Sequence, residues 1–246
     1  MITSKTNKIV KTVKSLEHKK YRDTLSLFAI EGDKLIEELS KVKEPEFILV
    51  REDRQTKHKY EKSYVVSNSV FKYLSNEKTP QGIIAVFKKN DEAKLNEIEV
   101  DNCLFLDNVQ DASNVGGLIR SSVCAGFDTC ICYNSADCYS PKAVRASAGG
   151  VFHTNIVKVD SYDYLDSFLK NNYDLIASDR KGSENVALNS HKNILIIGNE
   201  GKGIDDKLLK KANKKVKIPM TGKIDSLNAS VSGALLMYKI SGYFNE

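Results

Sequence analysis

The sequence lacks a pair of cysteines separated by two residues, which is the usual ligand spacing of a structural zinc site. Its five cysteines, an odd number, are Cys103, Cys124, Cys130, Cys132 and Cys138. Most of them stand in apolar runs, where a reduced cysteine behaves as a small hydrophobic residue. We therefore expect free thiols, a reducing cytoplasmic environment and no metal site.

Long apolar stretches are also absent. No run approaches the roughly 20 residues that cross a bilayer. The N-terminal MITSKTNKIVKTVK has no apolar core of the kind found in signal peptides. These absences favour a protein that is neither exported nor inserted into a membrane. With 246 residues and 41% hydrophobic residues, the chain can form one large or two smaller domains with buried cores.

Positive charge is concentrated at the N-terminus. Residues 1–22 hold seven basic residues against Glu17, a net +6 that exceeds the +5 of the whole chain. A basic helix is predicted near 4–19, with Ile9, Val13 and Leu16 on its apolar side. Its charged face fits a solvated surface as well as a contact with a phosphate backbone. The basic residues are Lys5, Lys8, Lys11, Lys14, Lys19, Lys20 and Arg22.

The pattern of apolar runs predicts two α/β domains. The first alternates helices with strands near 28–32, 47–52, 63–67 and 81–88. The polar stretch 88–102 is predicted to be a linker with the boundary near residue 98, giving domains 1–97 and 98–246.

The second domain is predicted to contain a mostly parallel sheet. From Cys103 onward, continuous apolar runs alternate with helical patterns, which is typical of a sheet covered by helices on both faces. In open sheets of this kind, ligands bind beyond the carboxyl ends of the strands. Three polar clusters follow such runs, and we expect the site there.

The first cluster is LDNVQDASNVGGLIRSSVCAGFD at 106–128. A helix is predicted to begin near Asn114, with Gly116 and Gly117 in its first turn, where a ligand or another backbone can approach closely. Arg120 follows in the same helix. From the residues alone, Asn114 could equally be a helix cap and Arg120 a surface partner of an acidic residue.

The second and third clusters also follow apolar runs. Gly198-Asn-Glu-Gly-Lys-Gly203 is a glycine-rich turn that can expose backbone groups to a ligand, but it matches neither the dinucleotide nor the P-loop pattern. Ile218-Pro-Met220 precedes Ser226-Leu-Asn228 and a helix rich in small residues. Ser226 also fits a helix N-cap.

Together and in this order, the three clusters resemble the motifs of the SpoU (TrmH-type) family of RNA 2′-O-ribose methyltransferases in the SPOUT superfamily. Those motifs are an asparagine, glycines and an arginine, then GNEGxG, then IPM and SLNxS. The segment SPKAVRASAGGVF (140–152) is similar to a further block of the family. The N-terminal half resembles the substrate-binding domain often fused ahead of the catalytic one. A departure is Ala112, where many relatives have proline; it alters a turn and no reactive group.

The resemblance implies a fold, a cofactor and partners. The expected fold is an α/β chain with a small RNA-binding domain and a mostly parallel catalytic domain that ends in a trefoil knot. The expected cofactor is S-adenosylmethionine, and the expected assembly is a homodimer with the active site at its interface. Ribosomal RNA is the preferred substrate because of the added N-terminal domain, with transfer RNA left open.

Site residues are carried over by the same resemblance. Cofactor contacts are expected from Ser178, Gly198, Glu200, Gly201, Ile218, Met220 and Leu227. Catalytic roles are expected for Asn114, Arg120, Glu200, Ser226 and Asn228. RNA contacts are expected from the seven basic residues of segment 1–22 and from Arg145.

The role of Arg120 stays open between a general base and a group that orients the ribose through the adjacent phosphate. Removing a proton from arginine at pH 7 costs about 9 kcal/mol, which favours phosphate binding. Two other functions compete with methyl transfer. A non-catalytic RNA-binding protein of ribosome assembly would not need Asn114, Arg120, Glu200 and Asn228 together. A nucleotide-dependent oxidoreductase would need a GxGxxG motif that NVGGLIR does not supply.

Overall fold

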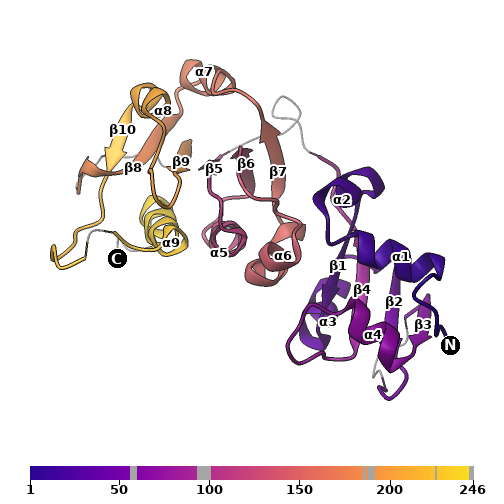
Figure 1. Cartoon of the computed structure of the whole chain (residues 1–246). Coiled ribbons are helices and arrows are strands. Elements are labelled where there is room, and N and C mark those ends of the chain that lie inside the picture. The colour runs from indigo at the N-terminus through magenta and orange to yellow at the C-terminus, as the bar shows by residue number, and fades with distance from the viewer. Residues whose placement is uncertain (56–59, 93–100, 185–186, 188–191, 225, 244–246) are drawn as a thin grey trace.

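The computed structural model describes residues 1–55, 60–92, 101–184, 187, 192–224 and 226–243. They form an N-terminal lobe (residues 1–92) and a C-terminal lobe (residues 101–243), each built on its own sheet (Figure 1). The domain boundary predicted near residue 98 lies outside the described residues.

The N-terminal lobe is a four-stranded sheet in the order β1-β4-β2-β3. Strand β4 pairs antiparallel with β1 and β2, while β2 and β3 are parallel. Helices α1 and α4 pack on one face of this sheet over a shared apolar core. The elements are β1 (Leu27–Glu31), α3 (Asp33–Ser40), β2 (Phe47–Arg51), β3 (Ser63–Val66), α4 (Asn68–Leu74) and β4 (Ile83–Lys88).

The single helix predicted near 4–19 is wrong. The structure has two helices there, α1 (Lys8–Ser15) and α2 (Lys19–Leu25). The first begins late because Asn7 caps it, accepting a hydrogen bond from the Ile9 N–H at 2.9 Å. The chain turns after Leu16, which is buried with Val13 as expected.

The second face of the N-terminal sheet packs against α3 and the C-terminal lobe. Phe28 of the sheet contacts Tyr139 and Phe152 of the C-terminal lobe, with ring centroids 5.2 and 5.5 Å apart, and Phe87 contacts Phe152 at 5.5 Å. One continuous cluster of buried residues runs through both lobes. The lobes therefore share a hydrophobic core.

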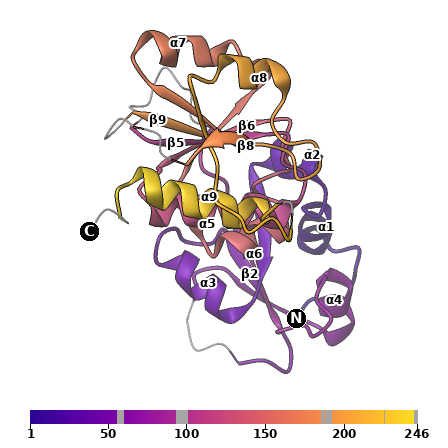
Figure 2. The same cartoon turned by 90° about the vertical axis from the view of Figure 1, so that its left-hand side faces the viewer.

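The C-terminal lobe contains a six-stranded sheet in the order β10-β8-β9-β5-β6-β7, and every pair is parallel, as the apolar runs predicted. Helices α7 and α8 cover one face, and α5, α6 and α9 cover the other (Figures 1 and 2). The elements are β5 (Cys103–Asp107), α5 (Ala112–Cys124), β6 (Thr129–Tyr133), α6 (Pro141–Ser147), η1 (Gly150–Phe152), β7 (Asn155–Val159), α7 (Tyr164–Lys170), β8 (Asp174–Ser183), β9 (Asn193–Ile197), α8 (Asp206–Lys211), β10 (Lys214–Val216) and α9 (Ala229–Ile240).

Glycines bring α5 close to both neighbouring helices. A Cβ at Gly116 would lie 2.2 Å from the carbonyl oxygen of Ala143 in α6. A Cβ at Gly233 in α9 would lie equally close, 2.2 Å, to the Leu118 side chain. Because any side chain at these two positions would collide with the neighbouring helix, the close packing of α5 between α6 and α9 requires glycine at both. Within the described residues, no helix has the length and apolarity of a membrane span.

The start of α5 differs from the prediction. Asp111, and not Asn114, caps the helix by accepting a hydrogen bond from the Ser113 N–H at 2.6 Å. Since the helix begins at Ala112, Gly116 and Gly117 lie in its second turn and not in its first. The trefoil knot implied by the family resemblance stays a prediction.

Candidate active site

A cavity of about 980 Å³ lies at the carboxyl ends of β8, β9 and β10. The second half of β8 and the segments that follow β9 and β10 form its wall, together with the residues that lead into α9. All residues carried over as cofactor contacts line it: Ser178, Gly198, Glu200, Gly201, Ile218, Met220 and Leu227. Ser226 and Asn228 line the same cavity.

The turn after β9 forms one wall and is held rigidly. Asn199 and Gly203 exchange two backbone hydrogen bonds of 2.9 Å. The Asn199 side chain accepts hydrogen bonds from the backbone of Gly201 and Lys202 and donates one of 2.9 Å to the Asn108 carbonyl. At Gly198, a Cβ would lie 2.4 Å from the Gly203 backbone, so a larger residue would break this turn.

The loop after β10 presents polar backbone groups to the cavity. Lys217 still donates its N–H to Ser183, but Ile218 and Leu227 form no backbone hydrogen bond with any other described residue. Met220 and Leu227 are 42% and 41% exposed. This wall therefore offers apolar side chains together with backbone donors and acceptors, the combination that small-molecule sites use.

A chain of hydrogen bonds runs along the edge of the cavity. The Glu200 carboxylate accepts from the Gln110 N–H at 3.2 Å, from the Asp111 N–H at 3.0 Å and from the Asn114 side-chain amide at 2.9 Å. The Asn114 Oδ1 accepts in turn from the Asn228 amide at 2.9 Å. Residues from three distant segments are thus joined.

The environment of Glu200 favours its ionised form. Burial disfavours the carboxylate, but the hydrogen bonds from Asn114 and from the Asp111 backbone outweigh this effect and lower the pKa of Glu200 below its ordinary value. Two of the donors are backbone N–H groups at the start of α5, where the helix dipole also favours a negative charge. Glu200 is an acceptor that fixes its neighbours.

Asn228 has a second structural task. Its Oδ1 caps α9, accepting from the Ser230 N–H at 2.9 Å and from the Val231 N–H at 3.3 Å. The sequence had left Ser226 as the possible cap, and that alternative is wrong. Ser226 is exposed and forms no hydrogen bond with the described part of the chain.

Arg120 lies apart from this chain of hydrogen bonds. It does not line the cavity, and its exposed guanidinium forms no ion pair or hydrogen bond with any residue that the structure describes. Gly116 faces α6 and Gly117 faces Ser230 of α9. One turn later, Arg120 emerges between these two helices.

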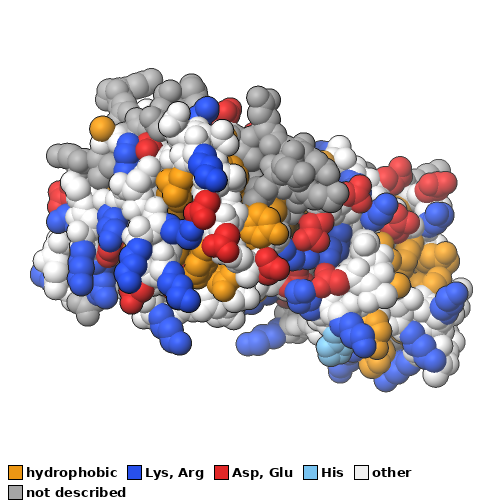
Figure 3. Space-filling view, turned by 90° about the horizontal axis from the view of Figure 1, so that it is seen from above, with side chains coloured by type: hydrophobic (Ala, Val, Ile, Leu, Met, Phe, Trp, Pro, Cys, Tyr) orange, Lys and Arg blue, Asp and Glu red, His pale blue; other side chains and the backbone are white. Residues whose placement is uncertain are grey.

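The basic N-terminal residues have different environments. Lys8, Lys11 and Lys20 are exposed, whereas Lys14 is half-buried and pairs with Glu17 at 2.6 Å. Lys19 pairs with Asp23, and Lys5 lies over the Tyr73 ring. On the face seen from above, Lys and Arg side chains lie over both lobes (Figure 3).

The RNA contact expected from Arg22 is wrong. Its side chain is 4% exposed, and it donates to the Asp137 carboxylate at 2.8 and 2.6 Å. It also donates to the Leu16 and Glu17 carbonyls at 2.7 and 2.8 Å. With its donors directed inward, Arg22 joins the two lobes and cannot take part in an RNA-binding surface.

Some residues of the site were not found from the sequence. Asp111 and Gln110 supply backbone donors to Glu200, and Asn199 fixes the glycine turn. Asp111 could have been found from the sequence, since aspartate is one of the preferred N-cap residues of helices. Within the described residues, no group of three or more His, Cys, Asp or Glu side chains could hold a metal ion.

Comparison with known proteins identifies the family. The profile described as the SpoU rRNA Methylase family matches residues 101–238, more than half of the chain. The chain belongs to this family. It is an RNA 2′-O-ribose methyltransferase whose methyl donor is S-adenosylmethionine. A second profile, the MRM3-like substrate binding domain, matches residues 7–85 of this methyltransferase.

Individual relatives match the methyltransferase over its full length. The 23S rRNA (guanosine(2553)-2′-O)-methyltransferase RlmP of Bacillus subtilis (strain 168) is 32% identical over 98% of this chain and 99% of its own. The AdoMet-bound rRNA methyltransferase from Sinorhizobium meliloti has a TM-score of 0.84 at 25% identity, covering 99% of this chain and 97% of that one. A solved RNA 2′-O ribose methyltransferase has a TM-score of 0.81 at 30% identity, covering 97% of each chain.

The cavity fits the cofactor of the family. Its volume of about 980 Å³ is sufficient for a nucleoside-sized ligand. Apolar side chains such as Ile218 can cover a purine ring, and the backbone groups of Ile218 and Leu227, which have no partner among the described residues, can bind its edge. The Gly198 position leaves no room for a side chain, so the turn beside the ligand is fixed.

Proposed function

We propose that this methyltransferase modifies a ribose of large-subunit ribosomal RNA, with S-adenosylmethionine held in the 980 Å³ cavity. The observation that carries the proposal is the convergence of three separate segments on that cavity, with the Glu200–Asn114–Asn228 hydrogen bonds at its edge. The substrate class rests on the Bacillus subtilis relative, whose name specifies 23S rRNA. A cytoplasmic location accords with this substrate.

The bound cofactor would supply an electrophilic methyl group on its sulfonium, so the transfer needs no metal ion to activate the donor. The backbones of Gly198, Ile218 and Leu227 bind the adenosine part, and Ser178, Gly201 and Met220 complete the pocket. Glu200 holds Asn114, and Asn114 holds Asn228, so the polar edge is already ordered before the ribose arrives. Such positioning of reacting groups can account for several kcal/mol of the barrier. Ser226 contributes a hydroxyl to the same wall.

Arg120 binds the phosphate next to the target ribose. Its exposed guanidinium has no acidic partner among the described residues, so its donors are available for a phosphate. Acting as a base would first require removal of its proton at a cost of about 9 kcal/mol at pH 7. We therefore assign Arg120 to orienting the 2′-hydroxyl through the RNA backbone.

A homodimer completes the proposal. Helix α9 and the loop before it expose Leu227, Val231 and Leu235, each between 41% and 47% exposed, and Ile224 at 74%. Val231 and Leu235 are one turn apart, so they share a face of the helix. Apolar side chains gathered on one face are typical of a subunit interface. Size-exclusion chromatography with light scattering would show a mass near twice 27.5 kDa.

The test is labelled-methyl transfer to unmodified large-subunit ribosomal RNA made by transcription. A 2′-O-methyl group protects the neighbouring phosphodiester from alkali, so the product is located as a gap in the hydrolysis ladder. Arg120→Ala is expected to bind the cofactor normally and to lose methyl transfer. Absence of cofactor binding by the wild-type protein would overturn the proposed function, and normal turnover by Arg120→Ala would overturn its assigned role.

A further inference from the structure

Two basic residues lie together on α6: Arg145, which the family resemblance already marks as an RNA contact, and Lys142, which has no role in the site described above. Lys142 and Arg145 are three residues apart, so they lie on the same side of the helix. Both belong to its solvent face, since Ala143, Val144 and Ser147 form the buried one. Their side chains are 62% and 51% exposed, which leaves much of each cation open to solvent.

Each cation is held by an acidic partner next to a functional part of the molecule. Lys142 donates to both carboxylate oxygens of Asp111, at 3.0 and 3.3 Å. The backbone N–H of Asp111 is bound to Glu200, so the Lys142 ammonium is anchored at the polar edge of the cavity. Arg145 pairs with Glu77, which belongs to the loop between α4 and β4 of the N-terminal lobe.

The same loop of the N-terminal lobe leads to a third cation. Glu31 fixes the loop by accepting hydrogen bonds from the Ser75 hydroxyl at 2.6 Å and from the Gln81 N–H at 2.8 Å. At the end of the loop, Gly82 lies against Arg54, whose guanidinium pairs with Asp33 and whose side chain is 42% exposed. The acid-paired cations Lys142, Arg145 and Arg54 thus lie next to the cavity edge, next to this loop and next to the end of the loop.

These three ion pairs contribute little to the stability of the fold. Exposed ion pairs contribute at most about 1 kcal/mol. A lysine ammonium has three donors and a guanidinium has five, so an acidic partner leaves further donors free. The partner also limits the motion of a long side chain, which reduces the ordering needed when a phosphate binds.

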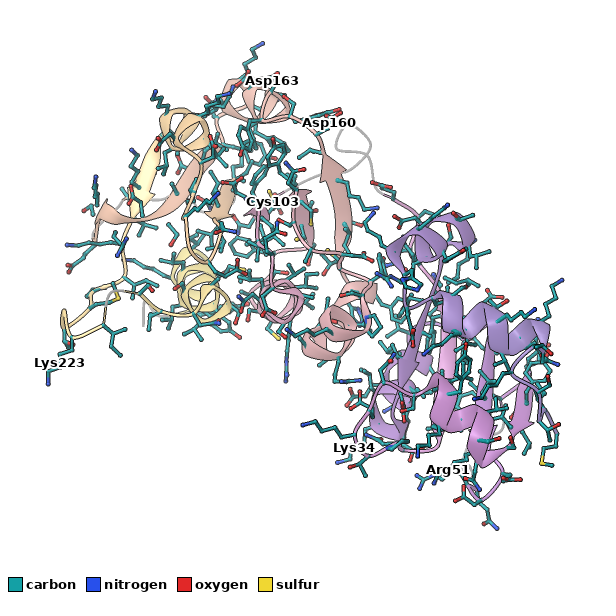
Figure 4. The ribbon with its side chains drawn as sticks, in the orientation of Figure 1. Lys34, Arg51, Cys103, Asp160, Asp163 and Lys223 are labelled. Atoms are coloured by element: carbon teal, nitrogen blue, oxygen red, sulfur yellow. The ribbon has the colours of Figure 1, made fainter. Side chains whose placement is uncertain are left out.

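We propose that the RNA backbone crosses between the lobes over α6, with Lys142 and Arg145 binding consecutive phosphates and Arg54 continuing the path. This inference rests on the proposed RNA methyltransferase function and adds the route by which the substrate reaches the site. Lys34, at the start of α3, lies on the lower side of the N-terminal lobe, the side on which α5 and α6 cover the C-terminal sheet (Figure 4).

The test is the salt dependence of RNA affinity, measured with the full-length protein and transcribed, unmodified large-subunit ribosomal RNA. Each lost phosphate contact lowers the slope of log K against log salt by roughly 0.7–0.9. In the double variant Lys142→Met/Arg145→Met, the slope is expected to fall by about twice that amount, with cofactor affinity unchanged. The charge-retaining variant Lys142→Arg/Arg145→Lys is expected to have a slope close to that of the wild type.

A matched control carries the same change of charge elsewhere. Lys170 on α7 and Lys192 before β9 are both exposed and lie away from α6, so Lys170→Met/Lys192→Met should keep the wild-type slope. An unchanged slope for the α6 variant, with or without a lower unfolding midpoint, would overturn the proposed route. The wild-type protein is measured first, because its failure to bind cofactor or methylate RNA counts against the proposed function and not against the route.

Discussion

The buried ion pair between Arg22 and Asp137 predicts a large effect on stability. The two side chains are 4% and 7% exposed, and two hydrogen bonds of 2.6 and 2.8 Å join them. In Arg22→Met, the Asp137 carboxylate loses its counter-charge, and the carbonyls of Leu16 and Glu17 lose their donor. Removing one partner of a buried pair typically costs about 3–5 kcal/mol.

The expected loss is a large share of the stability of a domain, which is about 5–15 kcal/mol. For a chain of this size it corresponds to a fall in melting temperature of roughly 6–20 °C. The free energy of unfolding would be measured by urea titration followed by circular dichroism. Lys19→Met is the control, because its pair with Asp23 is exposed and should contribute less than about 1 kcal/mol.

A double-mutant cycle separates the pair from its neighbours. Arg22→Met/Asp137→Leu removes both charges, so it should lose less stability than the sum of the single variants. If Arg22→Met costs less than about 1 kcal/mol, the pair is not buried as described. Separate unfolding transitions for the two lobes in the wild-type protein would refute the shared core.

Two further predictions concern smaller perturbations. Burial disfavours the Asp23 carboxylate, but hydrogen bonds from Lys19 and Lys89 lower its pKa to about 2. This pKa is below the unfolded value of 3.8, so the ionised carboxylate stabilises the folded state. The free energy of unfolding of the wild type should exceed that of Asp23→Asn by on the order of 1 kcal/mol above pH 3.8, and the difference should disappear as pH falls through 2. A difference that does not depend on pH would contradict this prediction. Asn228→Ser keeps a good cap on α9 but cannot reach Asn114, whose Oδ1 loses its donor, so stability should fall by about 1 kcal/mol while kcat falls roughly tenfold. A normal kcat in single-turnover methylation would refute the role given to that hydrogen bond.

The sequence predicted the strands well because each is a short apolar run between polar residues. The strand expected at 28–32 is Leu27–Glu31, and that expected at 47–52 is Phe47–Arg51. Strand β8 extends beyond the apolar residues expected, to Ser183, because β10 pairs with it through an irregular register at Lys215 and Val216. Pairing with a distant strand is not visible in a local pattern.

The errors have a common physical cause. At the starts of α5 and α9, several polar residues could serve as caps, and backbone geometry selects Asp111 and Asn228. The burial of Arg22 depends on Asp137, which is 115 residues away. Charge in the sequence predicts a basic segment, but tertiary contacts decide which of its residues remain on the surface. The carboxyl ends of the strands were predictable as the location of the site, whereas the hydrogen bonds that join its segments were not.

Helix α5 explains why Arg120 does not line the cavity of its own chain. Asn114 is tied to that cavity, and Arg120 follows six residues later, about 9 Å along the helix axis and turned by about 240°. The helix cannot rotate to correct this, because Gly116 and Gly117 hold it against α6 and α9. A phosphate on Arg120 and a ribose beside Asn114 of one chain would therefore lie on different sides of α5. The proposed homodimer resolves this geometry, since a second chain packed on α9 can place its cavity in front of the first chain's Arg120.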